Sequence, residues 1–164
     1  MYRNLIFSTA LSMFLLLSAF SIAAAQRPGG YSPETNEYRI FSLINNERSR
    51  TGLSHLVWND RLADLARSYS ETMARDGRFD HIDSNGDTVV ERARHLHVRG
   101  WSKIGENLFE CESTSSFVNL AVRGWMRSST HRDNILDPEW SDTGIGIAYA
   151  RNGEIYITEV FSVK

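Results

Sequence analysis

The chain has 164 residues and a formal net charge of −2. Its 18 Lys and Arg residues are offset by 20 Asp and Glu residues, which excludes the basic footprint of a nucleic-acid-binding domain and a polybasic segment for anionic lipid. Cys111 is the only cysteine, so an internal disulfide is excluded and the fold must depend on its hydrophobic core. We expect Cys111 to be a small, half-buried apolar residue.

The first 25 residues have the composition of an export signal. Arg3 gives a basic start, an apolar run extends from Leu5 to Ile22, and Ala23-Ala24-Ala25 provides the small side chains that signal peptidase accepts. We therefore predict a signal peptide at 1–25, a linker at 26–33 and one domain at 34–164, secreted or, in a cell with an outer membrane, periplasmic. An uncleaved anchor is the alternative, because the run is close to the ~20 apolar residues of a membrane span.

Helix signals occupy the first part of the predicted domain. Ser32-Pro33-Glu34 is a typical helix start, and this helix should end near Gly52. Asn59 is a good N-cap for a second helix, whose apolar stripe runs through Leu62, Leu65, Ala66, Tyr69 and Met73 to Gly77 as its C′ residue.

Two shorter helices are predicted further along the chain. Thr88-Val89-Val90-Glu91 matches a capping box, which predicts a helix from there to about Val98. A fourth helix should begin near Ser115 or Ser116, because apolar residues follow at helical spacing up to Met126.

Strand signals gather at the C-terminal end. Apolar residues alternate in 145–149 and again in 155–161, and Asn152-Gly153 between them predicts a hairpin with a type I′ turn. A further strand is expected at 105–109. Helices followed by antiparallel strands indicate an α+β layered fold.

Two histidines and one glutamate are the candidates for a functional site. His81 follows the second helix, Glu106 begins a strand, and His131 lies where a helix runs into a loop, so all three could meet in one cleft. Imidazole and carboxylate groups suit a divalent metal such as zinc. The alternative is that each is a hydrogen-bonded structural residue. His55 has no evident partner, and His95 and His97 lie among Arg92, Arg94 and Arg99, which indicates a solvated basic face.

An ordered set of short motifs resembles the CAP superfamily, the group of cysteine-rich secretory proteins, antigen 5 and pathogenesis-related-1 proteins. The similarity is closest to bacterial SCP-like domains and covers Asn36 to Phe161. It rests on Phe79-x-His81, Gly86, Glu91-Arg92-Ala93, Gly105-Glu106-Asn107, Trp125-x-x-Ser128, His131-Arg132-x-Asn134-Ile135-Leu136 and Gly144-Ile145-Gly146. The resemblance implies a three-layer α-β-α sandwich with a short antiparallel sheet that ends in a C-terminal hairpin.

The resemblance also implies a site. His81 and His131 correspond to the metal-contacting histidines, while Glu106 corresponds to a glutamate that orients them, with Asn107 beside it. Ser128 stands where eukaryotic members have a second glutamate. With serine in place of glutamate, the surroundings of the metal lose a negative charge and a hydrogen-bond acceptor. We therefore expect a divalent cation, zinc or another, to bind weakly.

Three functions compatible with this pattern remain. The first is a non-catalytic extracellular binding module for a lipid, a sterol or a protein, with a groove lined by Trp101, Leu108, Phe109 and Phe117, although each of these suits an ordinary core. The second is a metal-assisted hydrolase with Glu106 as general base, and the missing second carboxylate argues against it. The third is a structural domain of the cell envelope with an inert cleft. No nucleic-acid partner and no membrane span in the mature chain are expected.

Overall fold

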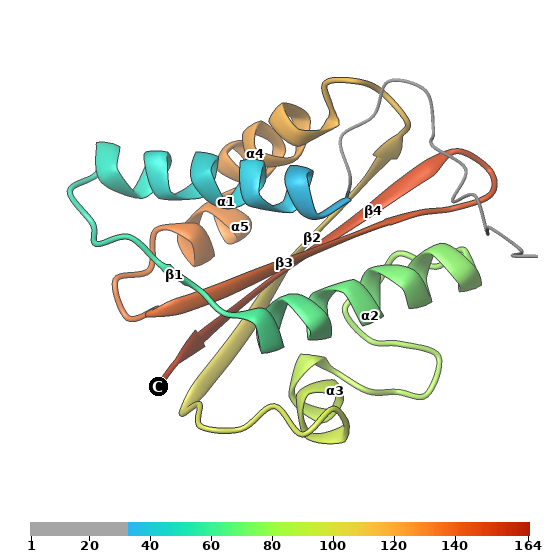
Figure 1. The fold of residues 1–164 in the computed structure, drawn as a ribbon, viewed down its shortest axis with the longest axis horizontal. Coiled ribbons are helices and arrows are strands. Elements are labelled where there is room, and N and C mark those ends of the chain that lie inside the picture. The colour runs from blue at the N-terminus through green and yellow to red at the C-terminus, as the bar shows by residue number, and fades with distance from the viewer. Residues whose placement is uncertain (1–32) are drawn as a thin grey trace, which may run out of the picture.

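A four-stranded sheet forms the middle layer of the protein (Figure 1). The computed structural model describes residues 33–164, so the predicted signal peptide and most of the linker lie outside the described residues. The elements in chain order are α1 (Pro33–Arg50), β1 (Val57–Trp58), α2 (Asp60–Asp76), α3 (Val89–His95), β2 (Lys103–Glu112), α4 (Phe117–Arg127), α5 (Ser129–Ile135), β3 (Asp142–Tyr149) and β4 (Glu154–Val163).

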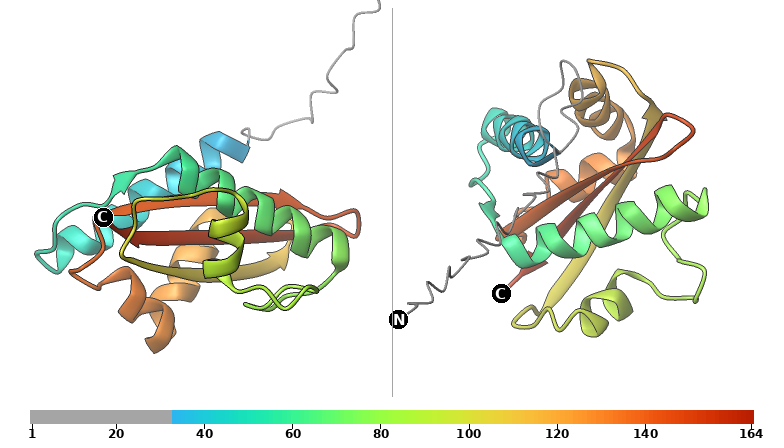
Figure 2. Two further views of the ribbon diagram at one scale, coloured as in Figure 1. Left: turned by 90° about the horizontal axis from the view of Figure 1, so that it is seen from below. Right: turned by 45° about the vertical axis from the view of Figure 1, so that its right-hand side comes forward.

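The strands lie in the order β1-β3-β4-β2. The long strands β2, β3 and β4 pair antiparallel, whereas the two-residue β1 pairs parallel with β3. Helices α1, α4 and α5 cover one face, and α2 and α3 cover the other (Figures 1 and 2). The predicted α+β three-layer sandwich with a C-terminal hairpin is therefore confirmed.

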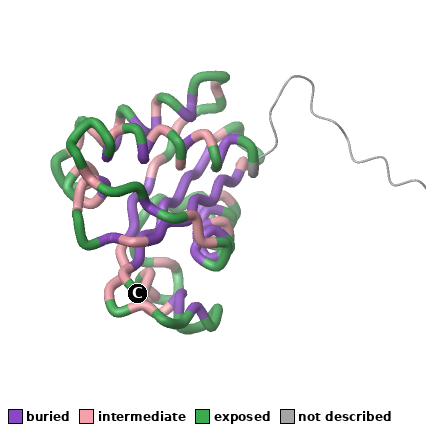
Figure 3. Tube along the Cα trace, turned by 60° about the vertical axis from the view of Figure 1, so that its left-hand side comes forward, coloured by how far each residue is buried: buried purple, intermediate pink, exposed green. Residues whose placement is uncertain are grey.

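Both faces of the sheet are buried, as the purple strands of Figure 3 show. Along β4, Ile155, Ile157 and Phe161 pack into the core on the side of α1, α4 and α5. Tyr156 and Val160 alternate with them and pack on the side of α2 and α3. Because successive residues of a strand point to opposite faces, one strand supplies both cores.

Two glycines of β3 allow α2 to pack closely on the sheet. A Cβ on Gly144 would lie 2.1 Å from the backbone nitrogen of Ala63, and a Cβ on Gly146 would lie 2.0 Å from that of Arg67. The motif Gly144-Ile145-Gly146 thus sets the short distance between α2 and the sheet. It thereby also positions the loop with His81, which follows α2.

The predicted helix boundaries of α2 and the start of α3 are confirmed by their caps. The side chain of Asn59 accepts hydrogen bonds from the amides of Arg61 and Leu62. Gly77 ends α2 in the left-handed conformation with φ of 61°. Thr88 and Glu91 form the reciprocal capping box that opens α3.

Two predictions about local structure were wrong, and two short elements were missed. Helix α3 ends at His95, not near Val98, because the amides of His97 and Val98 bond back to Arg94 and Ala93. The β3–β4 turn is not type I′, since Gly153 has positive φ but Asn152 does not. Strand β1 and helix α5, both short, were not predicted.

The outer edge of β2 is covered by side chains of the neighbouring helices. The indole nitrogen of Trp125 in α4 donates to the carbonyl of Leu108 at 2.8 Å. The amide of Asn134 in α5 donates to the carbonyl of Glu106 at 3.3 Å. These bonds attach the α4–α5 pair to the strand that carries Glu106 and Asn107.

Candidate functional site

The predicted site residues surround the edge strand β2. Glu106 points toward α3, where it bonds to Arg92, and Asn107 points to the opposite face, toward α5. His81 reaches Glu106 from the loop after α2, and His131 lies on α5. The two histidines therefore approach β2 from opposite layers of the sandwich.

The imidazole of His81 is oriented by Glu106. Its Nδ1 lies 3.0 Å from Glu106 Oε1. The His81 side chain is 56% exposed, whereas that of Glu106 is only 5% exposed. The hydrogen bond to Glu106 raises the pKa of His81 above its usual 6.5, against the opposing effect of burial. With Nδ1 as the donor to Glu106, the Nε2 atom of a neutral His81 has its lone pair available for a ligand.

Arg92 holds the carboxylate of Glu106 in place. Its Nη2 donates to both oxygens of Glu106, at 2.9 and 2.8 Å. Its Nη1 donates to the carbonyls of His81 and Asp87, at 3.1 and 2.7 Å, and its guanidinium lies 3.3 Å from the centre of the Tyr69 ring. Arg92 therefore joins the His81 loop to β2.

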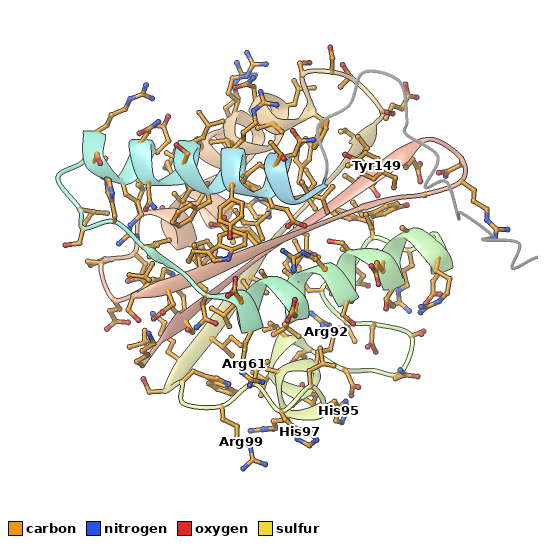
Figure 4. All side chains as sticks on the ribbon, viewed as in Figure 1. Arg61, Arg92, His95, His97, Arg99 and Tyr149 are labelled. Atoms are coloured by element: carbon orange, nitrogen blue, oxygen red, sulfur yellow. The ribbon has the colours of Figure 1, made fainter. Side chains whose placement is uncertain are left out.

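This role corrects the assignment of Arg92 to a solvated basic face, because the residue is only 8% exposed. Figure 4 shows it beneath α2, whereas Arg99 points outward. Tyr69 was predicted only as a core residue, but its hydroxyl also donates to the carbonyl of Asp80, next to His81. The Glu91-Arg92-Ala93 motif was the one sequence signal for this contact.

His131 is placed by two asparagines. The amide of Asn107 donates to the carbonyl of His131 at 3.1 Å, and the amide of Asn134 donates to Asn107 Oδ1 at 3.0 Å. Burial, and to a lesser extent charge on His81, lowers the pKa of His131 below 6.5. Burial thus favours the neutral form of the His131 imidazole near pH 7.

The remaining predicted site residue, Ser128, joins α4 to α5. It is the N-cap residue of α5, and its side chain makes no capping hydrogen bond. His131 follows it three positions later in the chain.

A second carboxyl group lies buried under the site, where sequence reasoning had seen only a strand residue. Glu159 pairs across the sheet with Asn107 and is fully buried. Its Oε1 accepts a hydrogen bond from Thr143, while its Oε2 has no partner within the described part of the chain. Burial raises the pKa of Glu159 to about 8 despite hydrogen bonds and the charge of Arg48.

The apolar residues suggested as a groove belong mostly to the core. Leu108 and Phe117 are buried in separate hydrophobic clusters, and Phe109 packs edge-on against Trp125. A hollow of about 830 Å³ lies between the end of α2 and the β3–β4 turn, but none of the predicted site residues lines it. Cys111 is half-buried as predicted, and burial raises the pKa of its thiol.

The arrangement offers two imidazoles as metal ligands. Within residues 33–164, no group of three His, Cys, Asp or Glu side chains is placed to hold a metal ion. Both oxygens of Glu106 already accept hydrogen bonds from Arg92. The described residues therefore supply at most two imidazoles, and water or a ligand would have to fill the other positions around a cation bound there.

Comparison with known proteins identifies the fold. The model of the Cysteine-rich secretory protein family, CAP, matches residues 41–162. The chain belongs to this family. It is 31% identical over 120 residues to the uncharacterized protein YkwD of Bacillus subtilis, an alignment that covers 73% of this chain and 44% of YkwD.

Solved structures of bacterial proteins show the same CAP fold. An extracellular protein of Bacillus anthracis that contains an SCP domain superposes with a TM-score of 0.70 at 30% identity, over 80% of this chain and 41% of that one. An outer surface protein of Borrelia burgdorferi superposes with a TM-score of 0.71 at 18% identity, over 82% of this chain and 96% of that one. The chain thus spans less than half of its Bacillus relatives.

These solved relatives are described as extracellular or outer surface proteins. In the described portion of this CAP protein, no helix is long and apolar enough to cross a membrane.

Proposed function

We propose that this protein is a secreted, non-catalytic binding module whose cleft holds a divalent cation weakly between His81 and His131. The observation that carries the proposal is the bidentate contact of Arg92 with Glu106. It supports Glu106 as the residue that orients His81, and so supports the imidazoles as the groups that would face a ligand. The apolar run before residue 25 supports secretion.

The same contact argues against the hydrolase alternative. A general base must lie within hydrogen-bond reach of a water or substrate proton. The Glu106 side chain is buried, and both its oxygens are occupied by Arg92. Glu159 is a poor substitute, because it is fully buried on β4, where it pairs with Asn107, on the face of the sheet opposite to that of Glu106.

Cation binding should weaken as the pH falls. Metal ligation requires neutral imidazole, and Glu106 raises the pKa of His81. Protonation of His81 should therefore begin to release the cation above pH 6.5, before His131, whose pKa is lowered, takes up a proton. The Glu106 carboxylate that orients His81 thus also makes protons compete more strongly with the cation for the His81 imidazole.

Zinc titration of the tag-free protein tests the proposal. We expect calorimetry near pH 7.5 to give a dissociation constant at or above roughly 10 μM, a weak site for zinc, and a rise in melting temperature with added zinc. His81→Ala and His131→Ala should each abolish both signals. His55→Ala is the matched control, because His55 is exposed and contacts Ser49 instead. Heat and melting curves unaffected by millimolar zinc would falsify the metal site.

An apolar ligand at the same cleft is favoured by one further observation. Phe79 and Ile82 flank His81 in the chain and are 43% and 45% exposed. A contiguous patch of large exposed apolar side chains typically marks a binding surface, and these two side chains lie three positions apart in one loop. The protein should retain lipid from a lipid extract, and Phe79→Ser with Ile82→Ser should abolish the retention. Equal retention by the double variant contradicts this assignment and leaves an inert cleft or a protein ligand.

A further inference from the structure

The buried carboxyl group of Glu159 has few donors of its own. Glu159 lies on β4 directly opposite Asn107 of β2, and both residues are fully buried. The hydroxyl of Thr143 lies 3.3 Å from Glu159 Oε1 but only 2.9 Å from the carbonyl of Val160. Because a hydroxyl has a single proton to donate, Thr143 must share it between these two acceptors. Oε2 has no partner within residues 33–164, so the site lacks the donors that a buried carboxylate would need.

Two donors that act on Glu159 hold helix α5 in place. Asn107 donates to the carbonyl of His131, in the first turn of α5, at 3.1 Å. Arg48 of α1 donates to the carbonyl of Ile135, the last residue of α5, at 2.8 Å. Burial raises the pKa of Glu159, and the charge of Arg48 and hydrogen bonding by Asn107 oppose this rise. The side chains that would stabilise an ionised Glu159 are therefore the ones that hold both ends of α5.

The charged groups of the surrounding helices act on α5 in different directions. Arg48 is the charge from α1 that acts on Glu159, whereas Arg123 and Arg127 of α4 are exposed. Burial lowers the pKa of His131 on α5, so its uptake of a proton favours release of the helix at low pH. Glu159 has the opposite effect, because it loses its proton more readily once water reaches it, which favours release at high pH.

We infer that Glu159 is a positioning residue for α5, and through α5 for His131, and that its carboxyl group must keep its proton for the helix to stay firmly docked. A neutral carboxyl group leaves Asn107 and Arg48 to the carbonyls of α5. A buried carboxylate would draw these donors away or reach for water, and either change loosens the helix. The inference needs no bound cation. Under the proposed function, release of α5 would also withdraw His131 from the cation.

Hydrogen exchange of the α5 amides tests this inference, because exchange through local opening reports how often the helix detaches. We expect the opening constant of residues 132–136, whose amides bond within the helix, to rise about fivefold from pH 7 to pH 8. The rise reflects the one proton that Glu159 releases on opening. In Glu159→Gln the constant should change less than about twofold. Glu71→Gln, exposed on α2, is the matched control and should keep the wild-type dependence.

Low concentrations of urea distinguish release of α5 from unfolding of the whole protein. Local opening exposes little surface and depends weakly on urea, whereas global unfolding depends on it strongly. The fivefold rise should therefore appear in the weakly urea-dependent exchange of α5. This measurement is made on the wild type, so it tests the inference even where Glu159→Gln does not fold.

Two results would overturn the inference. One is a local opening constant of α5 that stays the same between pH 7 and pH 8, since Glu159 would then have no link to the helix. The other is an equal rise in Glu159→Gln, since another group would then release the proton. Neither measurement uses zinc. The expected exchange in a protein that binds no zinc would refute the proposed cation site alone.

Discussion

Replacing Glu159 with Gln tests whether the carboxyl buried under the site is protonated in the folded protein. Burial raises the pKa of Glu159 from 4.5 to about 8. Between these values the folded protein keeps a proton that the unfolded chain has released, so the free energy of unfolding falls as the pH rises. The loss is about 1.4 kcal/mol per pH unit, or roughly 5 kcal/mol over the whole interval.

The Gln side chain has no such proton to lose. We therefore expect the difference in unfolding free energy between E159Q and the wild type to increase with pH through this interval, in favour of the variant. The amide NH₂ would be left without a partner, at a cost of about 1–3 kcal/mol that does not depend on pH. The slope of the difference against pH, and not its offset, is therefore the quantity to measure.

Urea unfolding of both proteins in steps of about one pH unit, from about pH 5 to 8, gives that slope. Glu71→Gln is the matched control, because Glu71 is exposed on α2, and its difference from the wild type should stay nearly constant. A flat difference for E159Q across the same range would refute the reasoning. It would mean that Glu159 is ionised in the fold, with Arg48 and Thr143 compensating its burial.

Three further predictions concern the packing of α2, the site and the α3 turn. Gly146→Ala should lower the free energy of unfolding by more than about 4 kcal/mol, because the new Cβ would lie 2.0 Å from Arg67 N; a loss under about 1 kcal/mol in urea would show that α2 can move away. Glu106→Gln should bring the pKa of His81 down toward 6.5, because their hydrogen bond is the main cause of its rise; an unchanged NMR titration contradicts this. His97→Gly should raise the melting temperature and increase the free energy of unfolding by up to about 1 kcal/mol, since glycine adopts φ of 54° without strain. A lower melting temperature would show that His97 is not strained.

Elements with strong local signals were predictable from the sequence. Asn59 and Gly77 cap α2, and Thr88 opens α3, through hydrogen bonds within a few residues of each other. The α+β class followed from helices early and strands late in the chain, whereas the three layers were implied by the resemblance to the CAP superfamily. Such features depend on nearby residues, so the sequence displays them directly.

The features that sequence reasoning missed depend on contacts between distant residues. Strand β1 exists because Val57 and Trp58 pair with β3, more than eighty residues later. Arg92 looks like a surface residue until Glu106 and the ring of Tyr69 are brought around it. No local pattern distinguishes these cases from ordinary loops and charged helix faces.

The same limit applies to the candidate site. Family motifs brought His81, Glu106 and His131 forward, and the structure places Glu106 in contact with His81. The motifs could not show that both carboxylate oxygens of Glu106 accept hydrogen bonds from Arg92. This contact is the main argument against Glu106 as a general base. Glu159 was also missed, since a glutamate in an apolar strand looks ordinary until its burial is known.

The hydrogen bonds from Trp125 and Asn134 to β2 have a consequence for solubility. A strand at the border of a sheet displays carbonyl and amide groups that another chain can pair with, and this is a route to aggregation. Here the carbonyls of Glu106 and Leu108 are already occupied. Self-association through this border would first require α4 and α5 to detach, so newly made chains are most vulnerable until that helical pair has docked.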